Sequence, residues 1–220
     1  MYSFRQRPDT EVVDEPLYGY YLVATGLDHP GRDQVLAAVD TDPQRVIDTV
    51  LLADGERPIR FTKNMAHHLV GLDLGFLDGL TNILLTRHPA RVLASLTVNL
   101  ADAAVDATGL PAQMAILDRI EAGGGHPVVV DSDEVLRDPA AVLAGLCDRL
   151  DIPFTDRMLS WPPGPKPEDG VWAPHWYTSV HRSTGFGPPT LPPDRTDDHP
   201  LLDRCLPMYH RLAALAIRAP

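Results

Sequence analysis

The sequence has 220 residues, of which 44% are hydrophobic. This length and apolar share predict a globular protein with a buried core and exclude a disordered chain. The formal net charge of −11 argues against nucleic acid or an anionic membrane surface as the main partner. Cys147 and Cys205 lack the spacing of a metal site, which favours a reduced, cytoplasmic protein.

The ends and apolar runs of the chain also bear on its location. No apolar run approaches the roughly 20 residues that span a bilayer. Residues 1–16 contain charges but no long apolar segment after them, so we expect no signal peptide. The sequence therefore predicts a soluble intracellular protein.

Short apolar runs alternate with amphipathic segments along the first 150 residues. The runs are β-branched or aliphatic and are bounded by polar residues, which is typical of buried parallel strands. They cover residues 11–14, 59–63, 82–86 and 127–131. Helices are expected where proline follows Asp or His, because proline suits the first position of a helix. They cover residues 42–54, 88–103 and 138–150. This alternation predicts an α/β fold with a mainly parallel sheet.

The composition changes after Trp161. A proline-rich stretch, PPGPKPEDG, leads into the aromatic block VWAPHWYTSVHRSTGF and a second proline-rich stretch over 187–200. Aromatic and basic residues alternate here, which favours a structured flap over a stiff surface tail. We expect one domain over residues 1–220, with an α/β core in 1–160, the flap in 161–200 and a helix in 201–218.

Polar side chains follow each of the expected strands. They are Asp14-Glu15, Lys63, Arg87 and Asp131-Ser132. In an open α/β sheet, ligands bind at the carboxyl ends of the strands, so these residues are candidates for one site.

Arg87 stands between an expected strand and the helix that begins at Pro89. An arginine can bind a phosphate through two hydrogen bonds, and the free N–H groups of a helix start favour the same anion. Ser95 could add its hydroxyl. Alternatively, Arg87 is a solvated loop charge and Ser95 is a small residue that lets the helix pack closely.

The segment TRHPARVLAS, residues 86–95, resembles the 3′-phosphate-binding segment of the sulfotransferases that use 3′-phosphoadenylyl sulfate. The resemblance implies that Arg87 and Ser95 bind the 3′-phosphate of this donor. RPDTEVVDEPLY and FTKNMAHHL resemble two further segments of the family. The block from Met158 to Phe186 is similar to the C-terminal part of bacterial and plant sulfotransferase-like domains, some of which are fused to branched-chain aminotransferases.

The resemblance implies a three-layer, P-loop NTPase-like α/β fold. In that fold the first strand leads into a loop that holds the 5′-phosphosulfate. Residues 1–10 resemble the end of the helix that follows this loop, and no comparable glycine-rich loop occurs elsewhere in the sequence. The first strand and the phosphate loop are therefore missing from this sequence. We expect a native start upstream of Met1 or, alternatively, a protein that has lost this half of its donor site.

The resemblance also implies roles in catalysis. Glu15 is the first candidate for the base that takes the acceptor proton, although it could instead cap a helix that starts at Leu17. His67 is the alternative base, and His68 is adjacent to it; only one of the two can face the site. Lys63 would stabilise the leaving phosphate. No metal site is expected, because ligands are not suitably spaced.

In the flap, the resemblance implies that four residues close over the 3′-phosphate and ribose of the donor. They are His181, Arg182, Ser183 and Thr184. Trp172, Trp176 and Tyr177 offer ring faces to the adenine or to an acceptor. Alternatively, these rings form a small aromatic core that holds the flap, an interpretation that we favour for Trp172.

The sequence thus predicts a sulfotransferase that transfers a sulfuryl group from 3′-phosphoadenylyl sulfate to the hydroxyl or amine of a small acceptor. A non-catalytic nucleotide-binding or interaction protein derived from a sulfotransferase is the alternative. A nucleotide kinase of the same architecture is a weaker alternative, because it requires a Lys-Ser/Thr phosphate loop. In a kinase, Asp131 would hold the magnesium ion.

Overall fold

A computed structural model of the protein describes residues 1–96, 104–188 and 199–219. The chain folds as two compact units. The first unit contains Met1–Leu80 and Thr155–Phe186, and the second contains Thr81–Phe154 and Gly187–Pro220. The expectation of one domain stays a prediction, since compact units also occur within a domain.

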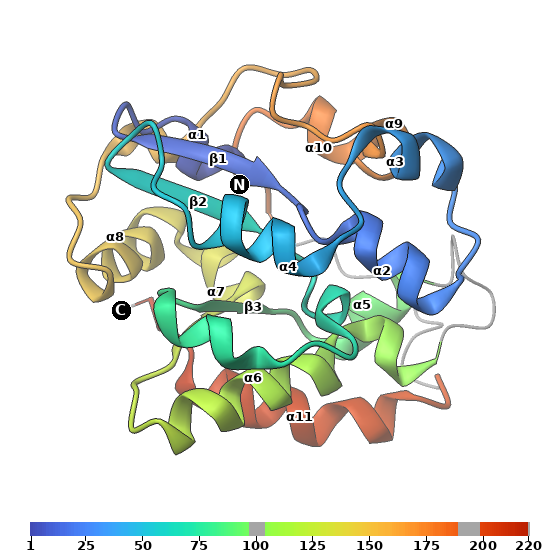
Figure 1. Cartoon of the computed structure of the whole chain (residues 1–220). Coiled ribbons are helices and arrows are strands. Elements are labelled where there is room, and N and C mark those ends of the chain that lie inside the picture. Colours follow the sequence, from blue (N-terminus) through green and yellow to red (C-terminus); the bar gives the residue numbers. More distant parts are fainter. Residues whose placement is uncertain (97–103, 189–198, 220) are drawn as a thin grey trace. The chain divides into compact units, whose positions relative to one another are not determined.

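In the first unit, two parallel strands lie side by side (Figure 1). They are β1 (Thr10–Asp14) and β2 (Ile59–Lys63), and their register runs from Thr10↔Ile59 to Asp14↔Lys63. Parallel pairing brings the carboxyl ends of both strands to the same edge. Asp14 and Lys63 therefore lie opposite each other where the strands end.

Short helices make up the rest of the first unit. The α-helices are α1 (Tyr2–Arg5), α2 (Tyr18–Thr25), α3 (Arg32–Ala38), α4 (Pro43–Val46), α9 (Ala173–Trp176) and α10 (Thr178–Arg182). A π-helical turn, Ile47–Leu51, continues α4, and three 3-10 helices cover Ala66–Leu69, Leu74–Gly79 and Asp156–Leu159. The Asp42 carboxylate caps α4 by accepting from the backbone N–H groups of Gln44 and Arg45 at 3.0 and 3.3 Å. This is the helix start that the Asp-Pro pattern predicts.

An aromatic core joins α2 and α3 to α9. Its buried residues are Tyr18, Tyr21, Leu22, Val35, Trp172, Ala173 and Tyr177. Trp172 is 2% exposed, and its ring lies edge-on to that of Tyr18 at 5.2 Å. Aromatic pairs of this geometry add to the free energy gained by burial alone. Trp172 thus packs in the core, as the second interpretation of the aromatic block predicts.

The second unit also contains a parallel pair, β3 (Ile83–Thr86) and β4 (Val128–Asp131). All four residues of β4 are buried. Its α-helices are α5 (Pro89–Leu96), α6 (Leu110–Ala122), α7 (Ser132–Arg137), α8 (Pro139–Arg149) and α11 (Leu202–Leu215). A 3-10 helix covers Val105–Thr108. In Figure 1, α6 and α11 lie side by side below β3.

The expected α/β class with parallel strands is confirmed, and each expected strand agrees with the structure to within one residue at its ends. Among the described residues the strands form two separate pairs. The second half of the helix expected over 88–103 and most of the proline-rich stretch at 187–200 lie outside the described residues. None of the helices in the described ranges is long and apolar enough to cross a membrane.

The described part of the flap has defined structure and is attached to the N-terminal residues. The Tyr2 hydroxyl donates to the Asp169 carboxylate at 2.7 and 2.9 Å. A β-bridge joins Ser160 to Gly185. The described residues of the expected flap thus have defined structure, and the division of the chain into a core, a flap and a C-terminal helix stays a prediction.

Candidate functional site

The backbone turns sharply at Glu15, directly after β1. Glu15 has a φ of +40°, a conformation that costs a residue with a side chain about 1–3 kcal/mol. Its N–H donates to the carbonyl oxygen of Lys63 at 2.6 Å, and its own carbonyl accepts from Tyr18 at 3.0 Å. This turn holds the Glu15 side chain at the ends of both strands.

The Glu15 side chain does not cap the helix that follows. Helix α2 begins at Tyr18, and no side-chain hydrogen bond caps it. Instead, the Lys63 ammonium donates to Oε1 of Glu15. The structure therefore contradicts the capping alternative, and the catalytic role of Glu15 stays a prediction.

The Lys63 ammonium has further partners at the strand ends. Its Nζ donates to the Tyr177 hydroxyl at 2.8 Å and lies 3.6 Å from Oδ1 of Asp14. The Lys63 side chain is 28% exposed, whereas the side chains of Asp14 and Glu15 are 1% and 8% exposed. The Lys63 ammonium thus forms ion pairs with two nearly buried carboxylates, and part of the Lys63 side chain remains accessible to solvent.

The two adjacent carboxylates have different surroundings. The Tyr177 hydroxyl lies 2.8 Å from both oxygens of Asp14, and the Gly170 N–H donates to Oδ2 of Asp14 at 3.3 Å. In Glu15, by contrast, no hydrogen bond from a described residue reaches Oε2. Nδ1 of His68 lies 3.9 Å from this oxygen. Asp14 is fully engaged by donors, and Glu15 keeps one oxygen available.

These surroundings change the proton affinities. Burial raises the pKa of Glu15, and the charge and hydrogen bond of Lys63 oppose this rise without cancelling it. Burial also raises the pKa of Tyr177 well above its ordinary value, and the charges of Glu15 and Asp14 add to the effect. Tyr177 therefore remains a protonated donor at neutral pH, while Glu15 is a stronger base than an exposed glutamate.

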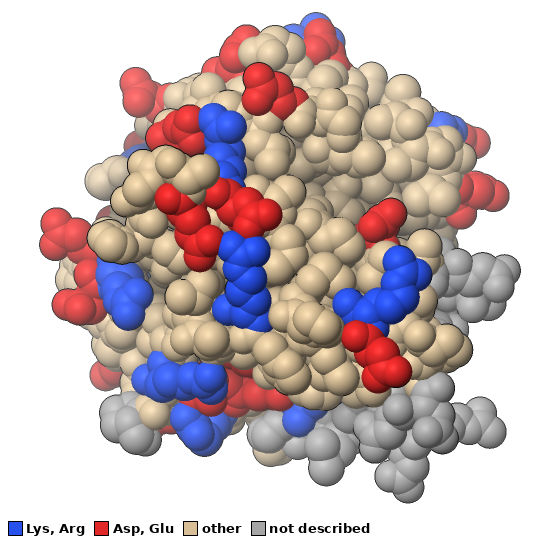
Figure 2. Space-filling model, turned by 90° about the horizontal axis from the view of Figure 1, so that it is seen from below, with Lys and Arg blue, Asp and Glu red and all other residues tan. Residues whose placement is uncertain are grey.

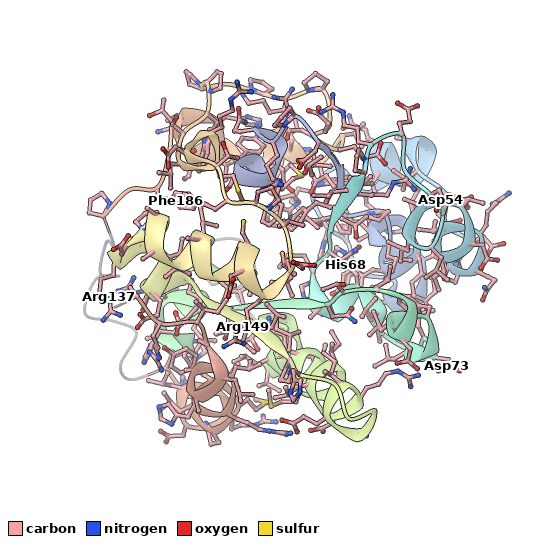
Figure 3. The ribbon with its side chains drawn as sticks, turned by 90° about the vertical axis from the view of Figure 1, so that its left-hand side faces the viewer. Asp54, His68, Asp73, Arg137, Arg149 and Phe186 are labelled. Atoms are coloured by element: carbon pink, nitrogen blue, oxygen red, sulfur yellow. The ribbon has the colours of Figure 1, made fainter. Side chains whose placement is uncertain are left out.

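The neighbouring histidines are neutral. Burial lowers the pKa of His67 to about 4 and lowers that of His68 as well, with nearby imidazoles and Lys63 adding to both shifts. The two rings are perpendicular, and His68 stacks on Tyr18 at 4.9 Å. Figure 3 labels His68, which is buried just beyond β2. Both rings pack against Tyr21, and His68 is the one of the pair that approaches Glu15. The role of His67 as a base stays a prediction.

Arg87 and Ser95 belong to the second unit. Arg87 lies between β3 and α5, its side chain is exposed, and it has no carboxylate at salt-bridge distance among the described residues. By contrast, Arg91 on α5 pairs with Asp133 at 2.7 Å. Ser95 is exposed near the end of the described part of α5. Arg87 therefore suits an anion, and its role with Ser95 stays a prediction.

Asp131 is occupied by contacts within the second unit. Its Oδ1 accepts from the backbone N–H of Asp133 at 2.8 Å, and its Oδ2 accepts from the Tyr209 hydroxyl at 2.8 Å. A carboxylate that caps α7 in this way has little capacity for a magnesium ion. The contacts weaken the kinase alternative.

Four residues of the flap are predicted to bind the nucleotide, and they differ in whether their side chains already bond other residues. His181 Nε2 lies 3.0 Å from Oδ2 of Asp169, and the Ser183 hydroxyl accepts from the Trp161 indole at 3.0 Å. Arg182 and Thr184 are exposed. His181 and Ser183 thus help to hold the flap in place, and the nucleotide contacts of all four residues stay predictions.

The sequence places Asp14 at a strand end without a role of its own, and it offers Tyr177 as a ring face or as part of an aromatic core. The structure places Tyr177 in that core and adds the contact between its hydroxyl and Asp14. The signal for Asp14 was its position opposite Lys63 at the end of a parallel pair. No local pattern indicates that the Tyr177 hydroxyl reaches the same point. Within the described ranges, no group of three His, Cys, Asp or Glu side chains could hold a metal ion.

Comparison with known proteins identifies the family. The family model described as "Sulfotransferase domain" matches residues 1–216. Two Arabidopsis thaliana proteins, named branched-chain-amino-acid aminotransferase-like proteins 1 and 2, are 43% and 39% identical to the chain over 216 and 215 residues. These matches cover 96% of this chain but 39% and 38% of the relatives, so the chain spans less than two fifths of their length. A solved sulfotransferase domain from the curacin biosynthetic pathway matches with a TM-score of 0.42 and 18% identity, covering 90% of this chain and 77% of that one. With its family match extending over nearly its whole length, the chain belongs to the sulfotransferase domain family.

Proposed function

We propose that the protein transfers a sulfuryl group from 3′-phosphoadenylyl sulfate to a hydroxyl or amine of a small acceptor. The observation that carries this proposal is the cluster of Glu15, Lys63, Asp14 and Tyr177 at the ends of β1 and β2. It combines a buried carboxylate of raised pKa with a partly exposed cation. Sulfuryl transfer needs a base for the acceptor proton and a positive group near the leaving phosphate.

In the proposed step one bond to sulfur forms as another breaks. The sulfur–oxygen bond to the phosphate breaks as the acceptor oxygen or nitrogen bonds to sulfur, and adenosine 3′,5′-bisphosphate leaves. Glu15 takes the acceptor proton on its available oxygen, Oε2. Lys63 offsets the charge that develops on the leaving phosphate. His67 is the alternative base, but a pKa of about 4 makes its imidazole a weaker one at neutral pH.

The second unit contains a candidate for binding the donor. Arg87 is exposed and has no salt-bridge partner among the described residues, so its guanidinium fits a phosphate. We propose Arg87 and Ser95 of the second unit for the 3′-phosphate. The nucleotide contacts expected of His181, Arg182, Ser183 and Thr184 in the first unit are a separate proposal. Figure 2 shows basic and acidic side chains intermingled on one face of the protein, whose formal net charge is −11. A small-molecule acceptor and a cytoplasmic location remain part of the proposal.

Nucleotide binding tests this function. Isothermal titration calorimetry should show that adenosine 3′,5′-bisphosphate binds more tightly than ADP, because ADP lacks the 3′-phosphate. The difference should disappear in Arg87→Ala. Equal affinities for the two nucleotides in the unmodified protein would contradict the proposal. Tight binding without release of adenosine 3′,5′-bisphosphate from the donor would favour a non-catalytic nucleotide-binding protein instead.

A further inference from the structure

The ion pair between Glu15 and Lys63 changes during the proposed reaction. When Glu15 takes the acceptor proton, it becomes neutral and no longer attracts Lys63 as an ion. At the same moment Lys63 is needed beside the leaving phosphate. A lysine side chain without a fixed partner has many accessible rotamers, and ordering it has an entropic cost. The site therefore needs a second partner for Lys63.

The structure contains such a partner. Nζ of Lys63 donates to the Tyr177 hydroxyl at 2.8 Å, and this hydroxyl lies 2.8 Å from both oxygens of Asp14. A phenol can accept one hydrogen bond while it donates another. Tyr177 thus links the cation to a carboxylate that is 1% exposed and is also held by the Gly170 N–H. These contacts to Lys63 do not depend on the charge of Glu15.

We propose that Tyr177 and Asp14 form a positioning pair that keeps the Lys63 ammonium in place while Glu15 gains and loses a proton. This proposal rests on the proposed function, because the reaction is what changes the charge of Glu15. The contacts among Tyr177, Asp14 and Lys63 all lie within the first unit. Tyr177 touches neither substrate. Its hydroxyl also lies 3.3 Å from Oε1 of Glu15, but the action that we propose for it is through the shorter contact with Lys63. Tyr177 is therefore a positioning residue. Asp14 accepts the hydrogen bond of the Tyr177 hydroxyl, and its negative charge strengthens this hydrogen bond.

Several charged or titratable groups surround Glu15. Asp14 and Lys63 come from the strands, and Tyr177 lies between α9 and α10. His68 approaches from the 3-10 helix Ala66–Leu69, and Tyr18 of α2 stacks on it. His68 and Tyr18 are neutral at pH 7, so Lys63 is the cation and Asp14 the other anion of this group. The proposed arrangement therefore includes both of these charged groups, Lys63 and Asp14.

The sequence offers a direct experiment, because lysine occurs at two positions, Lys63 and Lys166. Protein labelled with 13C,15N-lysine gives one set of side-chain NMR signals for each residue. Lys166 donates to the backbone carbonyls of Pro162 and Pro163 at 2.6 and 3.2 Å and serves as an internal reference. The measured quantity is the order parameter of the Lys63 Cε methylene, which reports how tightly the end of the side chain is held.

Glu15→Gln reproduces the neutral state of Glu15 in a permanent form. We expect Lys63 to keep its order parameter in Glu15→Gln and in Tyr177→Phe, because one partner remains in each. In the double variant Glu15→Gln/Tyr177→Phe, the order parameter should fall to the range below about 0.6 that marks flexible groups. The Lys166 signals should not change in any of these variants.

Tyr18→Phe is the matched control. Tyr18 is also a buried tyrosine of the aromatic core, but its hydroxyl bonds His29 at 2.9 Å and not Lys63. Glu15→Gln/Tyr18→Phe should keep Lys63 ordered. Loss of order in Glu15→Gln alone, or retained order in the double variant with Tyr177→Phe, would overturn the proposal. If Tyr177→Phe fails to fold, Asp14→Asn replaces it with the same expected results.

Nucleotide affinity separates this proposal from the proposed function. In the protein that retains Glu15, Tyr177→Phe should weaken binding of adenosine 3′,5′-bisphosphate by less than about threefold. In the Glu15→Gln variant, the same substitution should weaken binding about tenfold or more, as expected when a charged hydrogen bond is lost. Both proteins of the second comparison, Glu15→Gln and Glu15→Gln/Tyr177→Phe, lack the charge at position 15. The effect of this charge on affinity therefore cancels. If Lys63→Ala leaves affinity unchanged, the role of Lys63 in the proposed function fails. If Lys63→Ala weakens binding while Tyr177→Phe has equal effects in both backgrounds, the positioning pair fails.

Discussion

The hydroxyl of Tyr177 lies 2.8 Å from both carboxylate oxygens of Asp14, although 163 positions separate the two residues in the sequence. Asp14 ends β1, and Tyr177 lies between the two short helices of the flap. The contact therefore attaches the flap to the strand ends. It also makes the flap part of the polar cluster that surrounds Lys63.

Removing this hydroxyl should destabilise the protein. Tyr177→Phe leaves the buried Asp14 carboxylate without one of its donors, which costs about 1–3 kcal/mol of the free energy of unfolding. Urea denaturation followed by circular dichroism measures the difference. Tyr20→Phe is the control, because the Tyr20 hydroxyl bonds the Val70 carbonyl in an exposed position and should contribute less. Equal losses in the two variants would contradict a special role for the buried contact.

Gly170 is packed against an aromatic ring. A Cβ at this position would lie 2.1 Å from the Trp172 indole, and the Gly170 N–H also donates to Asp14. Gly170→Ala should displace the indole or the loop and lower the free energy of unfolding by about 1–3 kcal/mol, as overpacking does. At Gly187, where a Cβ would meet no atom of the described residues within 4 Å, alanine should change stability by less than about 0.5 kcal/mol. Thermal denaturation of the two variants makes the comparison.

The pKa of Glu15 should depend on Lys63. Lys63 opposes the rise caused by burial, so Lys63→Met should raise the pKa of Glu15 further. Titration of the carboxyl 13C signals in glutamate-labelled protein measures this value, and the signal lost in Glu15→Gln identifies residue 15. An unchanged or lower pKa in Lys63→Met would show that the ion pair does not control this carboxyl.

The same pKa has a consequence for stability. The folded protein holds the Glu15 proton more tightly than the unfolded chain, so this group favours folding below the ordinary glutamate pKa. Its contribution is lost as the pH rises from that value through the raised pKa of the folded state. In this window the free energy of unfolding should fall less steeply with pH in Glu15→Gln. Identical slopes for the two proteins would contradict the raised pKa.

Arg87 should contribute to binding of the 3′-phosphate. A hydrogen bond between charged groups contributes about 1.5–3 kcal/mol, so Arg87→Ala should weaken binding of adenosine 3′,5′-bisphosphate about tenfold or more. Arg149 is also exposed in the second unit, at the end of α8, and Arg149→Ala should have little effect (Figure 3). Calorimetry at fixed salt gives both values. A similar small change in the two variants would remove Arg87 from the proposed site.

Local chemistry made much of the fold predictable. Asp42-Pro43 and Asp138-Pro139 mark helix starts, because the Asp side chains cap the first turn and proline fits there. Apolar runs marked the strands, and parallel pairing then placed Lys63 near Glu15. These features depend on neighbours in the sequence or on one general rule for sheets.

The remaining parts of the site depend on contacts between distant segments. Nothing near Tyr177 in the sequence indicates that its hydroxyl reaches Asp14. The preference of Glu15 for Lys63 over a capping role depends on the positive φ at Glu15, which packing of the finished fold stabilises. The neutral state of His67 likewise follows from burial, which sequence spacing does not reveal.

The release of adenosine 3′,5′-bisphosphate from 3′-phosphoadenylyl sulfate tests the central claim most directly. It can be measured by chromatography, with pooled small phenols, alcohols and amines as acceptors. The proposed function predicts release by the unmodified protein and a loss of about a hundredfold or more in Glu15→Gln, in the range expected for a general base. Glu56→Gln, a change outside the strand-end cluster, should keep the activity. Release at the background rate by the unmodified protein, or equal rates in Glu15→Gln, would contradict the account.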